Sequence, residues 1–211
     1  MDKDTKPSHW PIAIFVAFLV ICGIAVVALL RAPPSPMPFR SFSIPSAGMV
    51  PTLDVGEYFF ANMWAFDEQG PARGDVVVFR LPRDPSTIYV QRVIGLPGEK
   101  VQITKGILHI DGQAVPTVDA GIYKEGKRKR ETLPNGVSVT TLDIVDNGFY
   151  DNTPVYQVPE GHYFMLGDNR DNSSDSRALR QVGYIPRANI IGRVGRIFWS
   201  PNPSRIGTQP K

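Results

Sequence analysis

An uncharged apolar segment near the N-terminus constrains this chain more than any other part of its sequence. The segment reads WPIAIFVAFLVICGIAVVALL, from Trp10 to Leu30. About 20 apolar residues, at about 1.5 Å per residue in a helix, are enough to cross the hydrocarbon core of a bilayer. A cleaved signal peptide has a shorter apolar core, about 7 to 15 residues, and no clean small-x-small cleavage site precedes Arg31. We therefore expect an uncleaved transmembrane helix over residues 10–30, after a short tail over residues 1–9.

The residues that flank this segment set the next boundary. Their charges do not orient the helix, because Lys3 and Lys6 on one side are matched by Arg31 and Arg40 on the other. The sequence RAPPSPMPF over residues 31–39 is rich in proline, which predicts a stiff, extended spacer. We expect the folded domain to begin near Arg40, so that it covers residues 40–211.

From residue 40 onward the sequence pattern is typical of β-strands. Short runs of β-branched and aromatic residues are separated by Gly, Pro and Asn, which predicts a mainly β domain of antiparallel sheets. The dipeptides at 111–112 (DG) and 135–136 (NG) suit two-residue hairpins, and LPGE at 96–99 suits a tight turn. Apolar alternation is weaker over residues 112–158, which predicts a small lobe inserted into the main barrel. The predicted strands span residues 73–81, 88–95, 100–110, 136–145, 161–167 and 189–199.

The overall composition fits one folded domain and argues against a nucleic-acid binder. The chain has 211 residues, 42% of them hydrophobic, and a formal net charge of +3. Basic residues are dense only in KEGKRKR, residues 124–130, which contains no interleaved aromatic residue. We interpret this run as a solvated loop, so no nucleic-acid partner is expected.

Sparse cysteine and histidine argue against several kinds of site. Cys22 is the only cysteine, so no intrachain disulfide is possible. The histidines, His9, His109 and His162, are scattered, and none belongs to a cluster at metal-ligand spacing. His109 and His162 fall in runs with strand pattern, where a structural role is favoured over a place in a Ser-His-Asp or Cys-His mechanism. We expect no metal and no cofactor.

Three blocks of sequence carry a resemblance to a known family. They are SIPSAGMVPTL with VGEYFF, then RGDVVVFRLPRDPSTIYVQRVIGLPGEKV, then GHYFMLGDNRDNSSDSR, in this order behind the apolar segment. Together they resemble the bacterial type I signal peptidases, membrane-bound serine endopeptidases that remove signal peptides from exported proteins. The resemblance covers nearly the whole chain. It implies the signal peptidase fold, a barrel of coiled antiparallel sheets.

The resemblance also implies a Ser-Lys pair, in which a neutral lysine removes the proton of the attacking serine. In the family frame P-S-x-S-M-x-P-T, this chain has Gly48 at the position of the nucleophile. In the frame Y-x-K-R-x-x-G-L-P-G, it has Gln91 at the position of the lysine. Glycine has no side chain, and a glutamine amide is no base at neutral pH. Both reacting groups are therefore missing from the positions where the family carries them.

The residues that support this pair match the family. Ser46 matches the serine that donates a hydrogen bond to the oxyanion, and Ser173 matches the one that orients the lysine. The alternative for Ser46 is a plain turn serine, and for GDNRDNSSDSR a polar loop that bonds to itself. The other retained positions are Met49, Arg92 and a supporting ion pair, Asp175 and Arg177.

The aromatic stretch EYFFANMWAF, residues 57–66, has two interpretations. In the family, apolar residues close to the site help the domain to lie against the membrane, and Tyr58 and Trp64 suit such an interface. Ordinary packing of a strand into the core would need the same residue types. The sequence favours neither interpretation, because both possible strand faces contain apolar residues.

These observations lead to three functional hypotheses. The first is a catalytically silent signal peptidase homologue, a pseudoenzyme that binds signal peptides of preproteins as extended strands. The second is a working serine endopeptidase, either with a displaced nucleophile, Ser46 or Ser43, or as a dyad-substituted form of an active enzyme. The third is a structural partner of an active signal peptidase encoded elsewhere. Each implies a single-pass protein of the bacterial inner membrane, in contact with lipid, with its β domain on the periplasmic or extracellular side.

Overall fold

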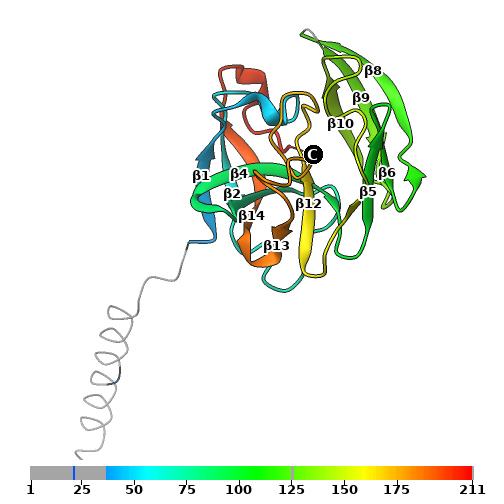
Figure 1. The fold of residues 1–211 in the computed structure, drawn as a ribbon. Helices are drawn as coiled ribbons and strands as arrows, with labels where there is room; N and C mark the ends of the chain where they lie inside the picture. Colours follow the sequence, from blue (N-terminus) through cyan, green and yellow to red (C-terminus); the bar gives the residue numbers. More distant parts are fainter. Residues whose placement is uncertain (1–20, 22–36, 125, 211) are drawn as a thin grey trace, which may run out of the picture. The chain divides into compact units, whose positions relative to one another are not determined.

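The structure, a computed structural model, describes Ile21, residues 37–124 and residues 126–210. The chain divides into two units, residues 1–36 and residues 37–211 (Figure 1). The predicted N-terminal tail, the predicted transmembrane helix apart from Ile21, and most of the predicted spacer lie outside the described residues. Within the part that is described, no helix combines the length and the apolar character needed to cross a membrane.

The largest sheet has seven strands in the order β1-β2-β14-β3-β4-β12-β13, and every neighbouring pair is antiparallel. β14 comes late in the chain but lies between β2 and β3, so the sheet joins the two ends of the domain (Figure 1). The strands are β1 Phe39–Ser43, β2 Tyr58–Asn62, β3 Val76–Leu81, β4 Asp84–Gly95, β12 His162–Leu166, β13 Ile185–Pro186 and β14 Ile190–Trp199.

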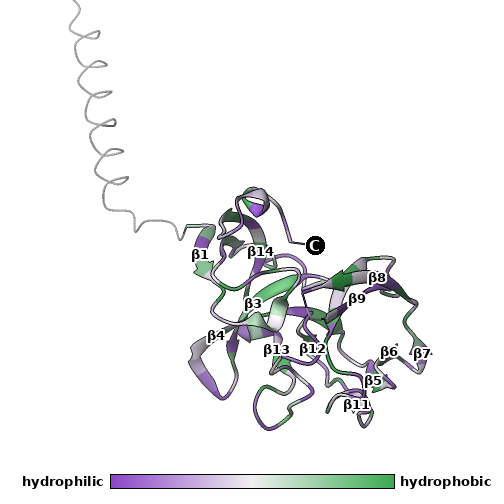
Figure 2. Cartoon of the chain, turned by 90° about the horizontal axis from the view of Figure 1, so that it is seen from above, coloured by the Kyte–Doolittle hydropathy of each residue, from purple (hydrophilic) through white to green (hydrophobic). Residues whose placement is uncertain are grey.

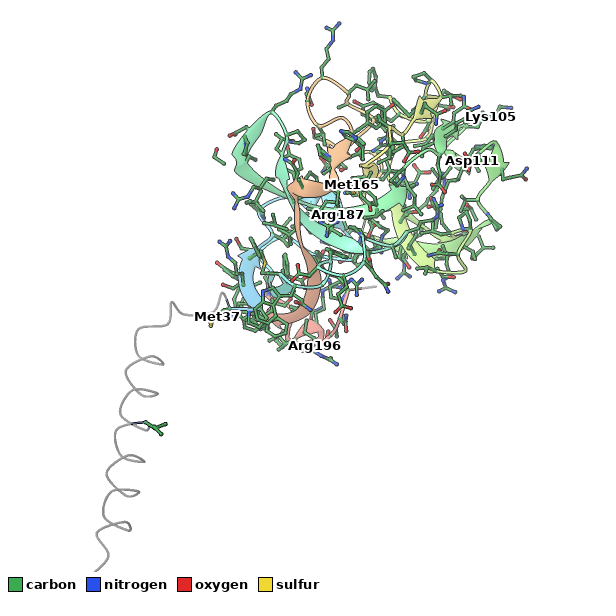
Figure 3. All side chains as sticks on the ribbon, turned by 90° about the horizontal axis from the view of Figure 1, so that it is seen from below. Met37, Lys105, Asp111, Met165, Arg187 and Arg196 are labelled. Carbon is green, nitrogen blue, oxygen red and sulfur yellow. The ribbon has the colours of Figure 1, made fainter. Side chains whose placement is uncertain are left out.

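β3 lies inside this sheet and is buried on both faces. Val76 and Val78 pack into one apolar cluster, and Val77 and Phe79 pack into another, which also contains Met165. Alternate residues of a strand point to opposite faces, so a continuous apolar run such as VVVF suits a strand that is covered on both sides. Figure 2 shows β3 as a hydrophobic segment within the domain, and Figure 3 places Met165 near its middle.

Two smaller sheets lie beyond β12, on the side away from β1 (Figures 1 and 2). One has the order β11-β5-β6-β7 and the other the order β10-β9-β8. A third apolar cluster ties the first of them to β12 through Phe164 and Leu166. The strands are β5 Lys100–Thr104, β6 Ile107–Ile110, β7 Gln113–Ala114, β8 Thr117–Tyr123, β9 Gly126–Thr132, β10 Ser138–Asp143 and β11 Tyr156–Gln157. Three short 3-10 helices complete the described elements: η1 Ala47–Met49, η2 Arg187–Asn189 and η3 Pro203–Arg205.

The predicted mainly β fold with antiparallel sheets is confirmed, and so are two of the three predicted turns. Asp111 and Gly112 have φ values of 51° and 78°, and they join β6 to β7 as a two-residue hairpin. The turn at 96–99 is closed by a hydrogen bond from the backbone N–H of Glu99 to the carbonyl of Leu96.

One strand prediction and one turn prediction need correction. The run at 100–110 is two strands, because Lys105 and Gly106, with φ values of 50° and 70°, turn the chain between β5 and β6. Lys105 and Asp111 lie at the same end of the domain (Figure 3). The dipeptide at 135–136 is not a two-residue hairpin, because the last paired residues of β9 and β10 are Thr132 and Ser138. Its longer loop is held by Asn135, whose Nδ2 donates to the carbonyl of Arg73 at 2.8 Å.

The basic run at 124–130 was expected to be a solvated loop, and this prediction is wrong. Most of the run lies in β9, the middle strand of the three-stranded sheet. Three of its cations have carboxylate partners: Lys124 pairs with Asp54 at 3.4 Å, Lys127 with Asp146 at 2.7 Å, and Lys129 with Asp143. These pairs reduce the repulsion between adjacent positive charges, which allows the run to form a strand.

Candidate functional site

A groove of about 790 Å³ lies between three segments of the chain. These are β1 with the loop that follows it, residues 87–91 of β4, and the loop residues 172–174; Tyr58 of β2 also contributes to the lining. Hydroxyl, amide and apolar side chains line the groove, and none of the described residues in its lining is charged. A neutral groove of this kind suits an uncharged ligand, since a charged group would lose hydration there without gaining a counter-ion.

Two free strand edges border the groove. Among the described residues, β1 is the outermost strand of the large sheet and pairs only with β2. β4 pairs with β3 along its length, but β12 pairs with it only from Arg92 to Gly95. Residues 84–91 therefore have no strand partner on that side within the described part of the chain. The unpaired backbone N–H and C=O groups of such edges are able to bind an added strand.

The loop after β1 places Gly48 in the groove lining. Gly48 belongs to η1, which begins directly after the extended residue Ser46. Asn169 holds this helix, because its backbone N–H donates to the carbonyl of Gly48 and its Nδ2 donates to the carbonyl of Ala47, each at 3.1 Å. On the other side, Met49 is 3% exposed and packs into the apolar core. The backbone at Gly48 is thus fixed although the residue has no side chain.

Nothing in the local packing requires glycine at position 48. A Cβ built there would lie 3.5 Å from the carbonyl oxygen of Asn172 and 3.5 Å from Ser173 Oγ, which are ordinary van der Waals contacts. The φ angle of Gly48 is not in the positive range that disfavours other residues. A Cβ therefore fits at this position without displacing its neighbours.

Gln91 lies on β4 across the groove from η1, and its side chain is almost fully buried, with 3% exposure. Its Nε2 donates to the carbonyl of Ser174 at 2.7 Å and contacts Ser173 Oγ at 3.4 Å. Its Oε1 is buried and accepts no hydrogen bond from any described residue. The structure thus brings Gly48, Gln91 and Ser173 together around one hydroxyl group, that of Ser173.

The predicted ion pair between Asp175 and Arg177 is present and buried. Arg177 Nε donates to Asp175 Oδ1 at 2.8 Å, and its Nη2 donates to Oδ2 at 2.7 Å. Asp175 also accepts the backbone N–H of Gly167, and Arg177 donates to the carbonyl of Arg170. These bonds close the loop that contains Ser173 upon itself, and Arg177 covers the ring of Tyr150 at 4.6 Å. The pair fixes the loop rather than facing the groove.

Arg92 is also buried, but its partner could not be identified from the sequence alone. It holds Asp168 with two hydrogen bonds, Nε to Oδ1 at 2.8 Å and Nη2 to Oδ2 at 2.6 Å. Thr52 donates its hydroxyl to the same carboxylate, and Arg92 Nη1 donates to the carbonyl of Gly74. This network connects β4, the end of the Gly48 loop and the end of β12. No local pattern in the sequence indicates this contact, because its partners are 76 residues apart.

Ser46 and Ser43 both line the groove and are exposed. The side chain of Ser46 does not cap η1, and no other described residue hydrogen-bonds to it. Ser43 is the last residue of β1 and pairs with Tyr58. Each hydroxyl is therefore open to a ligand in the groove.

The two described histidines lie away from the groove lining. The ring Nδ1 of His109 contacts the carbonyl of Ile107, and that of His162 contacts the carbonyl of Glu160, each within its own segment. Among the described residues, no group of three or more His, Cys, Asp or Glu side chains is placed to hold a metal ion.

The aromatic stretch at 57–66 contains both buried and exposed side chains. In β2, Phe59 and Ala61 are fully buried, whereas Tyr58 and Phe60 on the opposite face are each 44% exposed. Trp64, just beyond the strand, is 47% exposed. One face of β2 therefore packs into the core, and the other presents aromatic rings to the surroundings.

Comparison with known proteins places these features in a family. The family model described as signal peptidase, peptidase S26, matches residues 11–199. A signal peptidase I of Rickettsia bellii is 42% identical over 230 residues, which cover 94% of this chain and 75% of that protein. A signal peptidase I of Rickettsia typhi is 34% identical over 233 residues, covering 95% of this chain and 85% of that protein.

A solved structure is also similar in sequence. It is a signal peptidase I from Enterococcus faecalis V583, 28% identical, and the match covers 59% of this chain and 97% of that one. Its TM-score of 0.38 is too low to support a conclusion about a shared fold. The family assignment therefore depends on the sequence matches.

Proposed function

Because this chain belongs to the signal peptidase family, peptidase S26, we propose that it is a catalytically silent member that binds signal peptides without cutting them. The observation that carries the proposal is the composition of the groove. Gly48 and Gln91 stand where the family has its reacting serine and lysine, while the two free strand edges remain. An extended peptide adds to such edges through its backbone, and small pockets for alternate side chains supply specificity.

The missing groups explain why turnover is not expected. Cleavage needs a nucleophile oxygen within about 3 Å of the scissile carbonyl and a base that takes its proton. Gly48 supplies no oxygen, and the amide of Gln91 cannot act as a base at neutral pH. In another serine protease, loss of one central reacting group reduces kcat by a factor on the order of 10⁶. Both are missing here.

The remaining residues have a binding role in this proposal. Ser46, whose hydroxyl has no partner among the described residues, donates to a carbonyl of the bound peptide. Ser173 holds the amide of Gln91 in place, and the Asp175–Arg177 pair keeps the loop of Ser173 in shape. Met49 and Arg92 support the backbone on which Gly48 and Gln91 stand. The fold implied by this assignment is a signal peptidase barrel with an inserted lobe.

The proposal includes a place at the membrane. Four aromatic side chains with exposed fractions of 38–49%, which we call the aromatic surface, are Tyr58, Phe60, Phe198 and Trp199. Phe60 stacks on Phe198 with ring centroids 4.4 Å apart, and Tyr58 meets Trp199 edge to face at 5.6 Å. Aromatic rings with a polar tip suit the boundary between lipid and water. We place this surface against a bacterial inner membrane, with residues 10–30 as the anchor and the β domain on the periplasmic or extracellular side.

One observation favours a second candidate function, a working peptidase with a displaced nucleophile. Ser46 is exposed in the groove and its hydroxyl is free, as a nucleophile requires. It is two residues from position 48, however, and reaction rates fall steeply when attacking atoms are displaced. A displaced nucleophile also needs a base to take its proton. No Asp, Glu, His or Lys is among the described residues that line the groove.

Cleavage of a preprotein in detergent by three full-length proteins separates the two functions. They are the chain itself, the double variant Gly48→Ser with Gln91→Lys, and the single variant Ser46→Ala. If only the double variant cleaves, the groove is a preserved binding site that lacks its reacting groups. If the chain itself cleaves and Ser46→Ala abolishes cleavage, the displaced nucleophile is correct and the silent function is wrong.

Binding is tested on the same preparations. A fluorescent signal peptide with an Ala-x-Ala cleavage motif is titrated with the full chain in detergent, and saturable binding at micromolar concentrations is expected. A peptide of the same composition in scrambled order serves as the control. Absence of saturable binding, or equal binding of the scrambled peptide, contradicts the proposed function.

A further inference from the structure

A second cavity, of about 380 Å³, lies apart from the groove. Its lining comes from three parts of the domain: the chain just after η1, the three-stranded sheet of β8, β9 and β10, and residues 205–210. It shares no residue with the groove lining. An inference about this cavity therefore goes beyond the proposed function and does not depend on it.

The side chains of the second cavity are cationic or neutral. Arg128 and Arg205 both line it, together with hydroxyl and amide side chains, and its described lining contains no aspartate or glutamate. The charge of Arg205 is already offset, because its Nε lies 2.5 Å from the carboxylate of Glu57 and 3.6 Å from that of Asp54. Arg128 thus decides which ligands the cavity attracts.

Arg128 is half-buried and has no counter-charge. No described residue forms a hydrogen bond or an ion pair with its guanidinium, and its Nε is buried without an acceptor. Nη1 and Nη2 are not enclosed in this way, so they remain able to donate to a ligand. Nη2 extends over β8, where it lies 3.5 Å from the position that a Cβ of Gly121 would take. A partly desolvated cation without a partner costs free energy, which a bound anion offsets.

Two further donors line the same cavity. Arg130 lies opposite Thr140 in the pairing of β9 with β10, and alternate residues of a strand share a face, so Arg128 and Thr140 lie on one face of the sheet. Neither the hydroxyl of Thr140 nor the amide of Gln209 has a hydrogen-bond partner among the described residues. Donors from β9, β10 and the segment after η3 are therefore all available to one ligand.

These donors favour an anion with several oxygen atoms. A guanidinium presents a fork of N–H groups that matches two oxygens of a phosphate, and a hydroxyl and an amide suit the others. We propose that the second cavity binds a phosphate group, either free or on a lipid headgroup, with Arg128 as its principal contact and Thr140 and Gln209 as further donors.

The first test is titration of the full chain in detergent with inorganic phosphate, followed by calorimetry. Chloride at the same ionic strength is the control, because it screens charges without offering several oxygens. We expect saturable binding of phosphate at millimolar concentrations or lower, and none of chloride. Bound phosphate should also slow amide hydrogen exchange of residues 207–209. Absence of saturable phosphate binding would overturn the proposal.

Variants locate the binding. Arg128→Gln is expected to weaken phosphate binding at least about tenfold, and Thr140→Val, which removes one hydroxyl at nearly constant shape, about threefold. Arg130→Gln is the matched control, because Arg130 lies on the same face of β9 but is exposed and outside the lining; its affinity should change less than twofold. Equal losses in Arg128→Gln and Arg130→Gln would show attraction by overall charge and contradict a defined site. If Arg128→Gln fails to fold, an unchanged affinity in Thr140→Val contradicts it instead.

A last comparison identifies the source of the phosphate group. The full chain is placed in nanodiscs of phosphatidylcholine, with or without phosphatidylglycerol, and titrated again with inorganic phosphate. If phosphatidylglycerol abolishes the binding of free phosphate in the chain, the site takes a lipid headgroup. If free phosphate binds equally in both kinds of nanodisc, the site takes a soluble phosphate. Failure to bind phosphate in either nanodisc contradicts the proposal and leaves the peptide groove unaffected.

Discussion

The guanidinium of Arg92 holds both carboxylate oxygens of Asp168, at 2.8 and 2.6 Å, and neither side chain is exposed beyond 1%. Each residue stands next to a residue of the candidate site, because Arg92 follows Gln91 on β4 and Asp168 precedes Asn169, which holds η1. The pair therefore joins the two walls of the groove through the interior of the domain. Its loss is expected to affect both stability and the shape of the groove.

Asp168→Asn is expected to reduce the free energy of unfolding by about 3–5 kcal/mol, because it leaves the charge of Arg92 buried without its counter-charge. Urea unfolding followed by tryptophan fluorescence measures this change. Lys127→Met is the control, since it breaks an ion pair whose two side chains are more than half exposed, and such pairs contribute little. A loss of the same size in both variants would contradict the importance of burial.

Two glycines near the groove should respond in opposite ways to substitution by alanine. Gly48→Ala is expected to leave stability unchanged or to raise it by about 0.4–1 kcal/mol, because the added methyl meets ordinary contacts and alanine restricts the unfolded chain. Gly167→Ala is expected to reduce stability by about 1–3 kcal/mol, because a Cβ there overlaps the side chain of Ser173 and the carbonyl of Gly48. Thermal unfolding of both variants tests the prediction, and similar behaviour of the two would refute it.

The aromatic surface predicts that Trp199 lies at the depth of the lipid headgroups. The variant Trp10→Phe with Trp64→Phe leaves Trp199 as the only tryptophan of the chain. In proteoliposomes, lipids brominated near the headgroup should quench its fluorescence more strongly than lipids brominated at the chain ends. A matched variant that retains only Trp64 shows whether quenching is specific to the aromatic surface. No quenching of Trp199 at either depth would place this surface in water.

Arg205 should control the rigidity of the segment after η1. It donates to the fully buried Glu57 at 2.5 Å and to the carbonyl of Thr52 at 2.8 Å, so it links η3 to the chain that follows Gly48. The hydrogen bond to Glu57 raises the pKa of Arg205 above its ordinary value. Arg205→Met is expected to increase amide hydrogen exchange over residues 51–57 at least tenfold, with no change in β5. Unchanged exchange over 51–57 would show that η3 does not restrain this segment.

The sequence predicted a strand or turn correctly where a local residue pattern alone determines it. The VVVF run of β3 and the DG hairpin follow from strand periodicity and turn chemistry, and both are confirmed. The position of β9 could not be predicted in this way, because KRKR resembles a solvated loop until the carboxylates of Asp143 and Asp146 are known to lie beside it. Long-range charge pairing overrides local composition there.

The residues of the candidate site could be predicted from the sequence, but the buried contacts that hold them in place could not. Matching of sequence frames indicated that Gly48, Gln91 and Ser173 belong together, and the structure brings them around one hydroxyl. The partner of Arg92 and the link from Arg205 to Glu57 could not be predicted, because they join residues 76 and 148 positions apart. The unmet acceptor on Gln91 also depends on three-dimensional contacts, since it follows from the carbonyl of Ser174.

The packing around Gly48 has a consequence for the history of this protein. Glycine codons can become serine codons by a single base change, and so can glutamine codons become lysine codons. Because a Cβ fits at position 48 without a clash, one mutation could place a serine there and another a lysine at position 91. Packing does not prevent such a reversal. If the silent state is maintained across generations, natural selection rather than the architecture of the domain must maintain it.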